Sequence, residues 1–342
     1  MTDNNLEKCI IVIDAMGGDY APKHEILGAV AALKENNDFN LILVGDKEKI
    51  LSVAKQENVT LDEKMIQNAS QVIEMSDTPT SAIKSKPDSS IVVGAKLVRD
   101  KKAHAFVSAG NTGAVAAIST LVIGRLKNVD RPTIGSFIPS INNATFLFDV
   151  GAFVDVKPQH LLGWAVLAEI FVREIYSIAN PTIGLLNVGE EAEKGNKLVK
   201  ETAALLRESK LNFIGSVEGR DVLMGKCNIV LCDGFIGNIL LKFGESVPNF
   251  LKHLLKQHSE TSIVEKIKIG LVKSTIKKAL KPLNPEFYGG VPLLGVNGIS
   301  IIGHGSSTPL AIKNMILRAK EMYDKNLITK FEDALKDYAI AK

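Results

Sequence analysis

The amino-acid sequence predicts an α/β protein with a doubly wound, mostly parallel sheet and helices on both of its faces. Short apolar runs rich in Val, Ile and Leu alternate with longer helical segments along almost the whole chain, the pattern of such folds. Nearly every apolar run ends in glycine together with Asp, Asn, Ser, Thr, Lys or His. Because ligands of open α/β sheets bind at the carboxyl ends of the strands, we expect a ligand site there.

Composition favours a single catalytic domain over residues 1–342. The chain is 46% hydrophobic, 23% charged and only 6% aromatic, as expected for a soluble protein whose helices pack on a Val/Ile/Leu sheet. Its three cysteines form no C-x-x-C pair, which argues against a disulfide framework and a structural zinc site. We therefore expect a cytoplasmic location.

Hydropathy predicts no signal peptide and no membrane span. The apolar run at residues 10–13 is too short for a signal peptide. The longest apolar runs, at 114–124 and 161–172, fall short of the ~20 residues that cross a bilayer.

The first half of the chain is expected to alternate strands and helices. Residues 9–13 form a buried strand, and Pro22 then starts a helix over Lys23–Glu35. The same patterns predict strands at 41–45, 65–69 and 103–108, helices at 47–58 and 89–101, and a loop at 76–88.

The turn after residues 103–108 contains Asn111, Thr112 and Gly113 and opens a helix over 114–124. Its glycines let the backbone approach a ligand, and the free N–H groups of a first helical turn attract an anion. Alternatively, the turn is merely tight, and Asn111 or Thr112 only caps the helix. The motif alone is equally consistent with both interpretations.

The second half is expected to begin with a hairpin of two strands at 133–138 and 145–150, one antiparallel excursion from the parallel sheet. The apolar patterns then predict helices at 158–179 and 196–209, strands at 182–187, 211–216, 228–232 and 299–302, and a last pair of helices.

Acidic residues at strand ends could in principle hold a divalent metal: Asp14, Asp19, Asp149 and Asp233. Their spacing is not diagnostic, and such carboxylates often cap turns, so we expect no metal. Cys232 could be a nucleophile, but no histidine adjoins it, and a small core residue is the favoured interpretation. Neither a dinucleotide-binding glycine motif after a strand nor a P-loop is present.

Two basic side chains at strand ends are candidates for catalysis. His304 stands between two glycines before a Ser-Ser-Thr helix start, a setting that suits phosphate or an oxyanion. Lys194 lies in a loop after a predicted strand, although it also reads as a solvated lysine among glutamates.

Positive charge is concentrated in residues 245–281, which hold eight Lys and three Glu in a chain of net charge +3. Apolar residues recur there at helical spacing on both sides of a polar turn, which predicts a protruding amphipathic helical hairpin. Such a basic hairpin fits an anionic membrane surface, whereas packing on a dimer partner is the alternative. The residues expected to face the membrane are Phe250, Leu251, Leu254, Val264, Ile267 and Leu271.

Seven glycine-polar segments, in order from residue 14 to residue 307, resemble those of the acyl-acyl-carrier-protein:phosphate acyltransferase family of bacterial phospholipid synthesis (PlsX). They are Asp14-Ala-Met-Gly-Gly-Asp19, Ser108-Ala-Gly-Asn-Thr-Gly113, Asp149-Val-Gly-Ala152, Gly184-Leu-Leu-Asn-Val-Gly189, Lys194-Gly-Asn196, Asp233-Gly-Phe-Ile-Gly-Asn238 and His304-Gly-Ser-Ser307. Two positions depart from the family pattern: Phe153 replaces a usual Asn, and Gly303 replaces a usual Ala or similar residue.

The resemblance implies an enzyme that moves a long acyl chain from acyl carrier protein to inorganic phosphate, giving acyl phosphate. It implies a fold similar to isopropylmalate dehydrogenase and phosphotransacetylase, a homodimer, and a membrane glycerol-3-phosphate acyltransferase as the next enzyme. The peripheral association with the membrane is expected from the basic hairpin. No cofactor and no nucleic acid are expected.

The resemblance also assigns expected site residues. Lys194, His304 and Asn238 are the expected catalytic residues. The residues expected to bind phosphate or substrate are Asp14, Gly17, Gly18, Asn111, Thr112, Gly113, Asn196, Asp233, Ser306 and Ser307. Two alternatives stay open: a nicotinamide-dependent dehydrogenase on the related fold, and a non-enzymatic membrane-surface scaffold.

Overall fold

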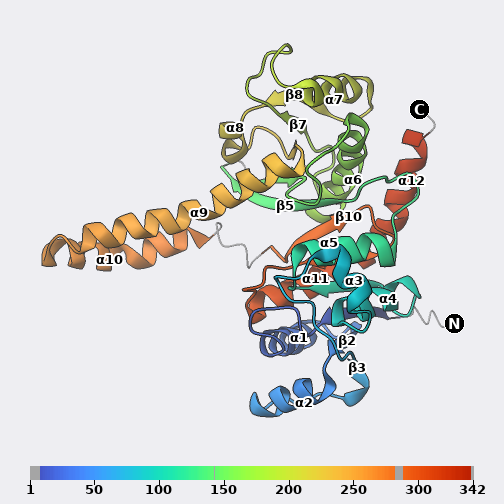
Figure 1. The fold of residues 1–342 in the computed structure, drawn as a ribbon. Helices are drawn as coiled ribbons and strands as arrows, with labels where there is room; N and C mark the ends of the chain where they lie inside the picture. Colours follow the sequence, from blue (N-terminus) through green and yellow to red (C-terminus); the bar gives the residue numbers. More distant parts are fainter. Residues whose placement is uncertain (1–7, 142, 282–287, 340–342) are drawn as a thin grey trace, which may run out of the picture.

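The computed structural model describes residues 8–141, 143–281 and 288–339. Within these residues the strands form one eleven-stranded sheet in the order β3-β2-β1-β4-β11-β10-β5-β6-β9-β7-β8. The molecule has two lobes and a long helical arm that projects from one side (Figure 1).

The first half of the chain builds one lobe from alternating strands and helices. Its elements are β1 (Cys9–Asp14), α1 (Lys23–Glu35), β2 (Phe39–Gly45), α2 (Lys47–Gln56), η1 (Glu63–Met65), β3 (Ile66–Asn68), α3 (Pro79–Ser85), α4 (Ser90–Arg99), β4 (Ala105–Ser108), α5 (Thr112–Ile118) and η2 (Ser119–Ile123).

The rest of the chain builds the second lobe and the arm, and then returns to the first lobe. Its elements are β5 (Thr133–Ser140), β6 (Asn143–Phe148), α6 (Pro158–Tyr176), β7 (Ile183–Leu186), α7 (Lys197–Glu208), β8 (Phe213–Val217), α8 (Gly219–Met224), β9 (Ile229–Leu231), α9 (Gly234–Ser259), α10 (Ile263–Ala279), β10 (Val291–Leu294), β11 (Ile299–Ile302), α11 (Pro309–Asp324) and α12 (Leu327–Ala339).

Strand direction reverses in the middle of the sheet. Strands β1, β2, β3, β4 and β11 are mutually parallel, and β10 pairs antiparallel with both β11 and β5. The hairpin of β5 and β6 is antiparallel, as expected, and β6, β9, β7 and β8 are again parallel to one another. The carboxyl ends of β1, β4 and β11 therefore point one way along the strands, and those of β6, β9 and β7 point the other way.

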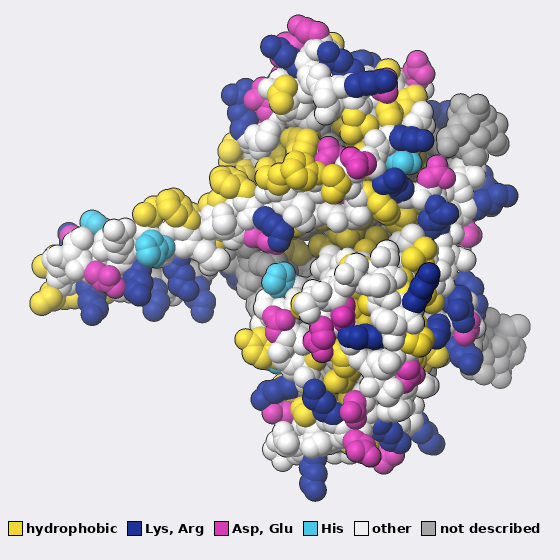
Figure 2. Space-filling model, viewed as in Figure 1, with side chains coloured by type: hydrophobic (Ala, Val, Ile, Leu, Met, Phe, Trp, Pro, Cys, Tyr) yellow, Lys and Arg dark blue, Asp and Glu magenta, His cyan; other side chains and the backbone are white. Residues whose placement is uncertain are grey.

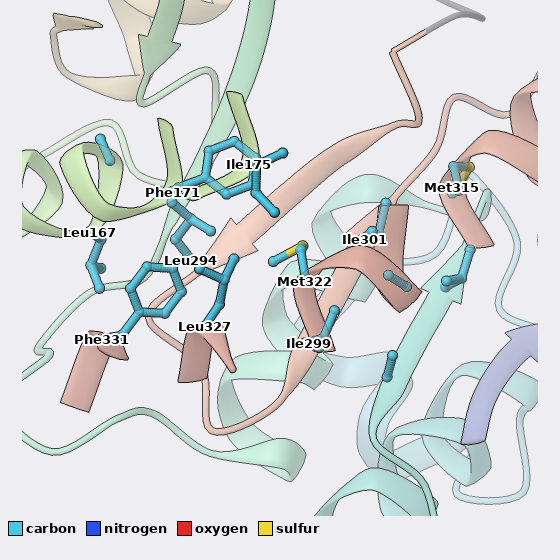
Figure 3. Close-up of a cluster of buried hydrophobic side chains, with 14 of the residues drawn as sticks. Leu167, Phe171, Ile175, Leu294, Ile299, Ile301, Met315, Met322, Leu327 and Phe331 are labelled. Carbon is cyan, nitrogen blue, oxygen red and sulfur yellow. The ribbon is translucent and has the colours of Figure 1, made fainter. Parts of the chain in front are cut away.

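Both faces of the sheet are buried. Along β1, Ile11 and Ile13 belong to one core cluster while Val12 belongs to the other, because successive strand residues point to opposite faces. Helices α1, α6, α7, α11 and α12 cover the first face, and α4, α5 and α8 cover the second. Figure 3 shows the first core where α6, α11 and α12 meet β10 and β11, around Phe171, Leu294 and Phe331. The expected layered α/β fold is confirmed.

Three local expectations need correction. The segment expected to be a loop at 76–88 contains α3, which begins at Pro79, a residue suited to a first helical turn. The helix expected over 114–124 divides into α5 and the π-helical turn η2. Strand β10 was not expected, because its four residues follow two glycines and include Pro292.

The arm is longer than the hairpin expected over residues 245–281. Its first helix, α9, begins at Gly234 inside the second lobe and runs without a break past Pro248. Its second helix, α10, buries none of its residues. All six residues expected to face a membrane are exposed on the arm, and lysines gather along one side of it (Figure 2). In the described part of the chain, no helix is long and apolar enough to cross a membrane.

Candidate functional site

The ends of β1 and β4 are joined by a buried carboxylate. Asp14 is fully buried, and its Oδ2 accepts a hydrogen bond from Ser108 Oγ at 2.6 Å. Ser108 Oγ accepts in turn from the backbone N–H of Gly110 at 3.1 Å. Burial raises the pKa of Asp14, and the hydrogen bond from Ser108 partly offsets that rise. The chain of bonds fixes the turn after β4 against the turn after β1.

Gly17 and Gly18 are needed because of close contacts at this junction. A Cβ on Gly17 would collide with the Asp14 carboxylate and would lie 2.8 Å from the backbone nitrogen of Gly110. A Cβ on Gly18 would collide with the carboxyl group of Glu25. The two glycines therefore serve close packing of turns, which sequence alone does not distinguish from a ligand contact.

Asn111 caps α5, which is one of the two interpretations that the sequence allowed for this turn. Its Oδ1 accepts from the backbone N–H of Ala114 at 3.0 Å, and its Nδ2 donates to the carbonyl of Met75 at 3.0 Å. Thr112 and Gly113, the next two residues, are exposed. The cap does not decide whether the turn also receives an anion.

The loop after β11 lies against the turn after β1. The backbone N–H of Asp19 donates to the carbonyl of Gly305 at 2.8 Å, and His24 Nδ1 lies 2.9 Å from the carbonyl of Ser307. Ser307 is nearly buried, whereas His304 and Ser306 are exposed.

The hydrogen bonds of His304 define its tautomer. The backbone N–H of Ser306 donates to Nδ1 of His304 at 3.2 Å, and Ser306 Oγ lies 2.8 Å from the same nitrogen. Because a backbone N–H can only donate, Nδ1 acts as the acceptor, and the neutral ring carries its proton on Nε2. The exposed imidazole therefore offers an N–H donor at Nε2.

A second cluster surrounds the buried carboxylate at the end of β6. Asp149 accepts from the backbone N–H groups of Ile134 at 2.9 Å, Ala152 at 2.9 Å and Phe153 at 2.8 Å. Burial raises its pKa to about 6 despite these bonds. Asn238 of α9 donates its side-chain N–H to the carbonyl of Val150 at 2.8 Å, so the start of α9 is held against this loop.

Asp233 and Asn196 are both helix caps. Asp233 Oδ1 accepts from the backbone N–H of Ile236 at 2.9 Å at the start of α9. Asn196 Oδ1 accepts from the backbone N–H of Val199 at 3.0 Å at the start of α7. Lys194, two residues before Asn196, is exposed in the loop after β7. Each of these side chains has a local structural task, whatever else it does.

The expected site residues fall into three groups on the sheet. Asp14, Gly17 and Gly18 lie together with the turn that contains Asn111 and with the His304 loop. Asp233 and Asn238 lie beside Asp149, and Lys194 and Asn196 follow β7. Strands β4 and β6 are four places apart in the sheet, roughly 19 Å at the usual strand spacing, and β7 is two places further away. Sequence order could not predict this separation, which follows from the strand order, because β11, β10 and β5 lie between β4 and β6.

Two side chains at the first group were not expected. Glu25 is buried beneath Gly18, and Ser108 links Asp14 to Gly110. The only sequence signal for Glu25 is an acidic residue in the first turn of a helix, which is usually exposed. In the described residues, no group of three or more His, Cys, Asp or Glu is placed to hold a metal ion.

Replacement of Cys232 by alanine is expected to leave kcat within a few-fold of wild type. Its Sγ is buried 3.6 Å from the carbonyl oxygen of Asp149, and burial holds the pKa of the thiol well above its usual range. A thiol that stays protonated is a poor nucleophile. Mass spectrometry of the enzyme quenched during turnover checks this, and an acyl group on Cys232 would contradict it.

Comparison with known proteins finds relatives over nearly the whole length of the chain. A family profile described as "Fatty acid synthesis protein" matches residues 9–330. A phosphate acyltransferase of Chlorobaculum parvum is 47% identical over 328 residues, covering 93% of this chain and 96% of its own. A phosphate acyltransferase of Halothermothrix orenii is 44% identical over 320 residues, with 93% and 96% covered.

Solved structures support the fold. A phosphotransacetylase from Streptococcus pyogenes aligns with a TM-score of 0.60 at 17% identity, covering 93% of this chain and 94% of its own. The EutD phosphotransacetylase from Staphylococcus aureus aligns with a TM-score of 0.56 at 15% identity, covering 92% and 94%. At these identities the likeness concerns the fold alone.

Proposed function

The chain belongs to the family described as fatty acid synthesis protein, and from that premise we propose that it is a phosphate acyltransferase. It transfers a long-chain fatty acyl group from acyl carrier protein to inorganic phosphate, and the acyl phosphate serves phospholipid synthesis. The observation that carries this proposal is the 47% identity to a phosphate acyltransferase over nearly the whole length of both chains. Nothing in the family match favours a nicotinamide-dependent dehydrogenase or a scaffold.

The direct test is turnover by the purified protein. Palmitoyl-acyl carrier protein and inorganic phosphate are mixed with the enzyme, and acyl phosphate is trapped with hydroxylamine as the hydroxamate. We expect hydroxamate and free acyl carrier protein in equal amounts, both dependent on phosphate. Release of acyl carrier protein without phosphate dependence would contradict the proposal.

The reaction needs positioning and charge stabilisation more than a strong base. An oxygen of phosphate attacks the thioester carbonyl carbon, and the carbon–sulfur bond of the tetrahedral intermediate then breaks. The leaving thiolate takes up a proton, and thiols with a pKa of about 8.5 are fair leaving groups at neutral pH. The chain has to hold phosphate near the thioester and to donate hydrogen bonds to the oxyanion.

The exposed groups at the ends of β4 and β11 suit these tasks. Thr112 and Gly113 are exposed at the start of α5, and the N–H groups of a first helical turn favour an anion. We assign phosphate binding to this turn. Nε2–H of His304 is the hydrogen-bond donor we assign to the oxyanion, and the leaving thiolate takes up the proton that the attacking hydrogen phosphate releases.

Lys194 is proposed to neutralise phosphate. Lys194 follows β7, which is six places from β4 in the sheet of one chain. This role therefore requires the substrate to extend from the turn after β4 to the loop that holds Lys194, or that loop to move toward the turn. Replacement of Lys194 by alanine is expected to lower kcat/KM for phosphate at least about tenfold. Initial rates at varied phosphate concentration measure this.

Lys197 provides a matched control for Lys194. It is exposed three residues further on and its Nζ lies 3.7 Å from Glu201, so the Lys197→Ala variant removes the same charge outside the proposed site. We expect its kcat/KM to equal that of wild type. Equal phosphate dependence in both variants would remove Lys194 from the site.

We also propose a homodimer that associates with the membrane through its arm. Eight large apolar side chains are exposed on α9 and α10 beyond Pro248, namely Phe250, Leu251, Leu254, Ile263, Val264, Ile267, Leu271 and Val272. Apolar residues at the base of α9 are exposed as well, including Phe235, Ile239 and Phe243. In this proposal the residues beyond Pro248 bind the lipid surface, and the residues at the base of α9 pack against the second copy of the chain. Peripheral attachment would bring acyl phosphate to a membrane glycerol-3-phosphate acyltransferase.

A further inference from the structure

A buried carboxyl group without a partner lies directly beneath the candidate site. Glu25 is 1% exposed in the first turn of α1, and its Oε2 has no hydrogen-bond partner among the described residues. A glutamate at this helix position ordinarily reaches back to the backbone N–H of the cap residue. Here the cap is Pro22, which has no N–H to offer.

The position of Glu25 joins the two loops that carry candidate site residues. Its Oε1 lies where a Cβ of Gly18 would be, in the turn after β1. The same turn receives the loop after β11, through the bond from Asp19 N–H to the carbonyl of Gly305. His24, next to Glu25 in α1, lies 2.9 Å from the carbonyl of Ser307. The Glu25 carboxyl group therefore lies against a turn that is bonded directly to the loop that holds His304.

The surroundings of Glu25 oppose a negative charge. Burial raises the pKa of Glu25 to about 8, its own backbone N–H lowers it, and the charges of Asp14 and Asp19 raise it further. The basic residues next to Glu25 in α1 are engaged elsewhere: Lys23 pairs with Glu57 at 2.6 Å, and His24 Nδ1 lies 2.9 Å from the carbonyl of Ser307.

Burying an unpartnered carboxyl group destabilises a fold, and such groups are retained mainly where they serve a function. We infer that Glu25 is a positioning residue for the proposed acyl transfer: its uncharged carboxyl group keeps the turn after β1 seated against the loop that carries His304. Loss of its proton places a negative charge beside the carboxyl groups of Asp14 and Asp19, which pushes the two loops apart.

The first test compares the pH dependence of kcat for wild type, Glu25→Gln and Glu25→Leu. Gln keeps the size and neutrality of the protonated acid, so its kcat equals that of wild type at pH 7 and exceeds it by at least about fivefold at pH 9. Leu keeps the bulk but lacks the carboxyl oxygen that accepts the backbone N–H of residue 25, so its kcat at pH 7 falls about tenfold while KM for phosphate stays within about twofold. A constant ratio of wild type to Gln from pH 7 to pH 9, or a Leu variant with wild-type kcat, overturns the inference.

The second test measures thermal unfolding and does not depend on the reaction. The unfolded chain loses the proton near pH 4.5 and the folded chain near pH 8, so wild-type stability falls as pH rises between these values. The Tm of Glu25→Gln minus that of wild type therefore widens from pH 5 to pH 8. A gap that stays constant over this range shows that Glu25 is already ionised and overturns the inference.

Thr202→Val is the matched control. Thr202 Oγ1 of α7 is also buried without a partner among the described residues, but it lies in the other lobe and cannot ionise. Removal of this hydroxyl group is expected to change Tm equally at all pH values and to leave kcat unchanged.

A wild-type enzyme that forms no acyl phosphate would contradict the proposed function, whereas the Tm comparison would still decide the protonation of Glu25.

Discussion

Replacement of His304 by alanine is expected to lower kcat at least about 100-fold. This is the usual loss of rate when a hydrogen-bond donor to the oxyanion is removed. Nδ1 of this ring accepts the backbone N–H of Ser306, so the group left for the substrate is the N–H at Nε2. Alanine removes that donor and also frees the N–H of Ser306. Single-turnover rates with acyl-acyl carrier protein measure the loss at the chemical step.

Two amide variants separate the roles of the two ring nitrogens. The amide nitrogen of Gln reaches the position of Nε2, whereas that of Asn reaches only the position of Nδ1. If Nε2–H donates to the oxyanion, His304→Gln retains more activity than His304→Asn. His253→Ala, at an exposed histidine of α9, controls for loss of an imidazole outside the site. Equal rates for the Gln and Asn variants would contradict the assignment of Nε2.

The double variant Leu254→Glu/Val264→Glu is expected to abolish binding to anionic vesicles. Both side chains are exposed on the arm, at 42% and 59%. Amphipathic helices bind a membrane surface because their apolar side chains enter the lipid and their lysines are attracted to anionic headgroups. Two carboxylates in the same patch oppose both effects. Co-sedimentation with phosphatidylglycerol vesicles measures binding, which we expect to be sensitive to salt in the wild type.

A charge-matched control distinguishes lost apolar contact from added negative charge. Ser259→Glu/Ser274→Glu adds two carboxylates to the same arm but removes no apolar side chain. We expect this control to bind vesicles more weakly than wild type and clearly more strongly than the first variant. Both variants should still dimerise and form acyl phosphate. Wild-type sedimentation of the first variant, or its collapse to unfolded monomers, would show that the patch is a protein contact.

Local interactions explain which parts of the site could be predicted from sequence. Asp46, Asn111, Asn196 and Asp233 each accept the backbone N–H three residues ahead. Such bonds depend only on residues that are neighbours in the chain, so a cap could be considered for Asn111 and Asp233, whereas Asn196 was expected only to bind phosphate or substrate. The alternation of apolar runs and helical segments is equally local, and the layered α/β fold follows from it.

The grouping of these residues depends on pairings between distant segments. Strand β10 was not expected, yet its antiparallel pairing with β11 and β5 decides the strand direction of the second lobe. Its insertion places the turns that follow β6, β9 and β7 away from those that follow β1 and β4. Lys194 and His304 could therefore be recognised as polar strand-end residues, but their relation in space could not.

The sequence by itself determined the strand and helix alternation, the polar strand ends and the basic amphipathic arm, because each depends on residues a few positions apart. Only the tertiary structure decided two further features: the reversal of the sheet and the burial of Glu25 beneath Gly18. Each of these arises when segments far apart in the chain pack together, and burial of an ionisable group depends on all the surfaces that close over it.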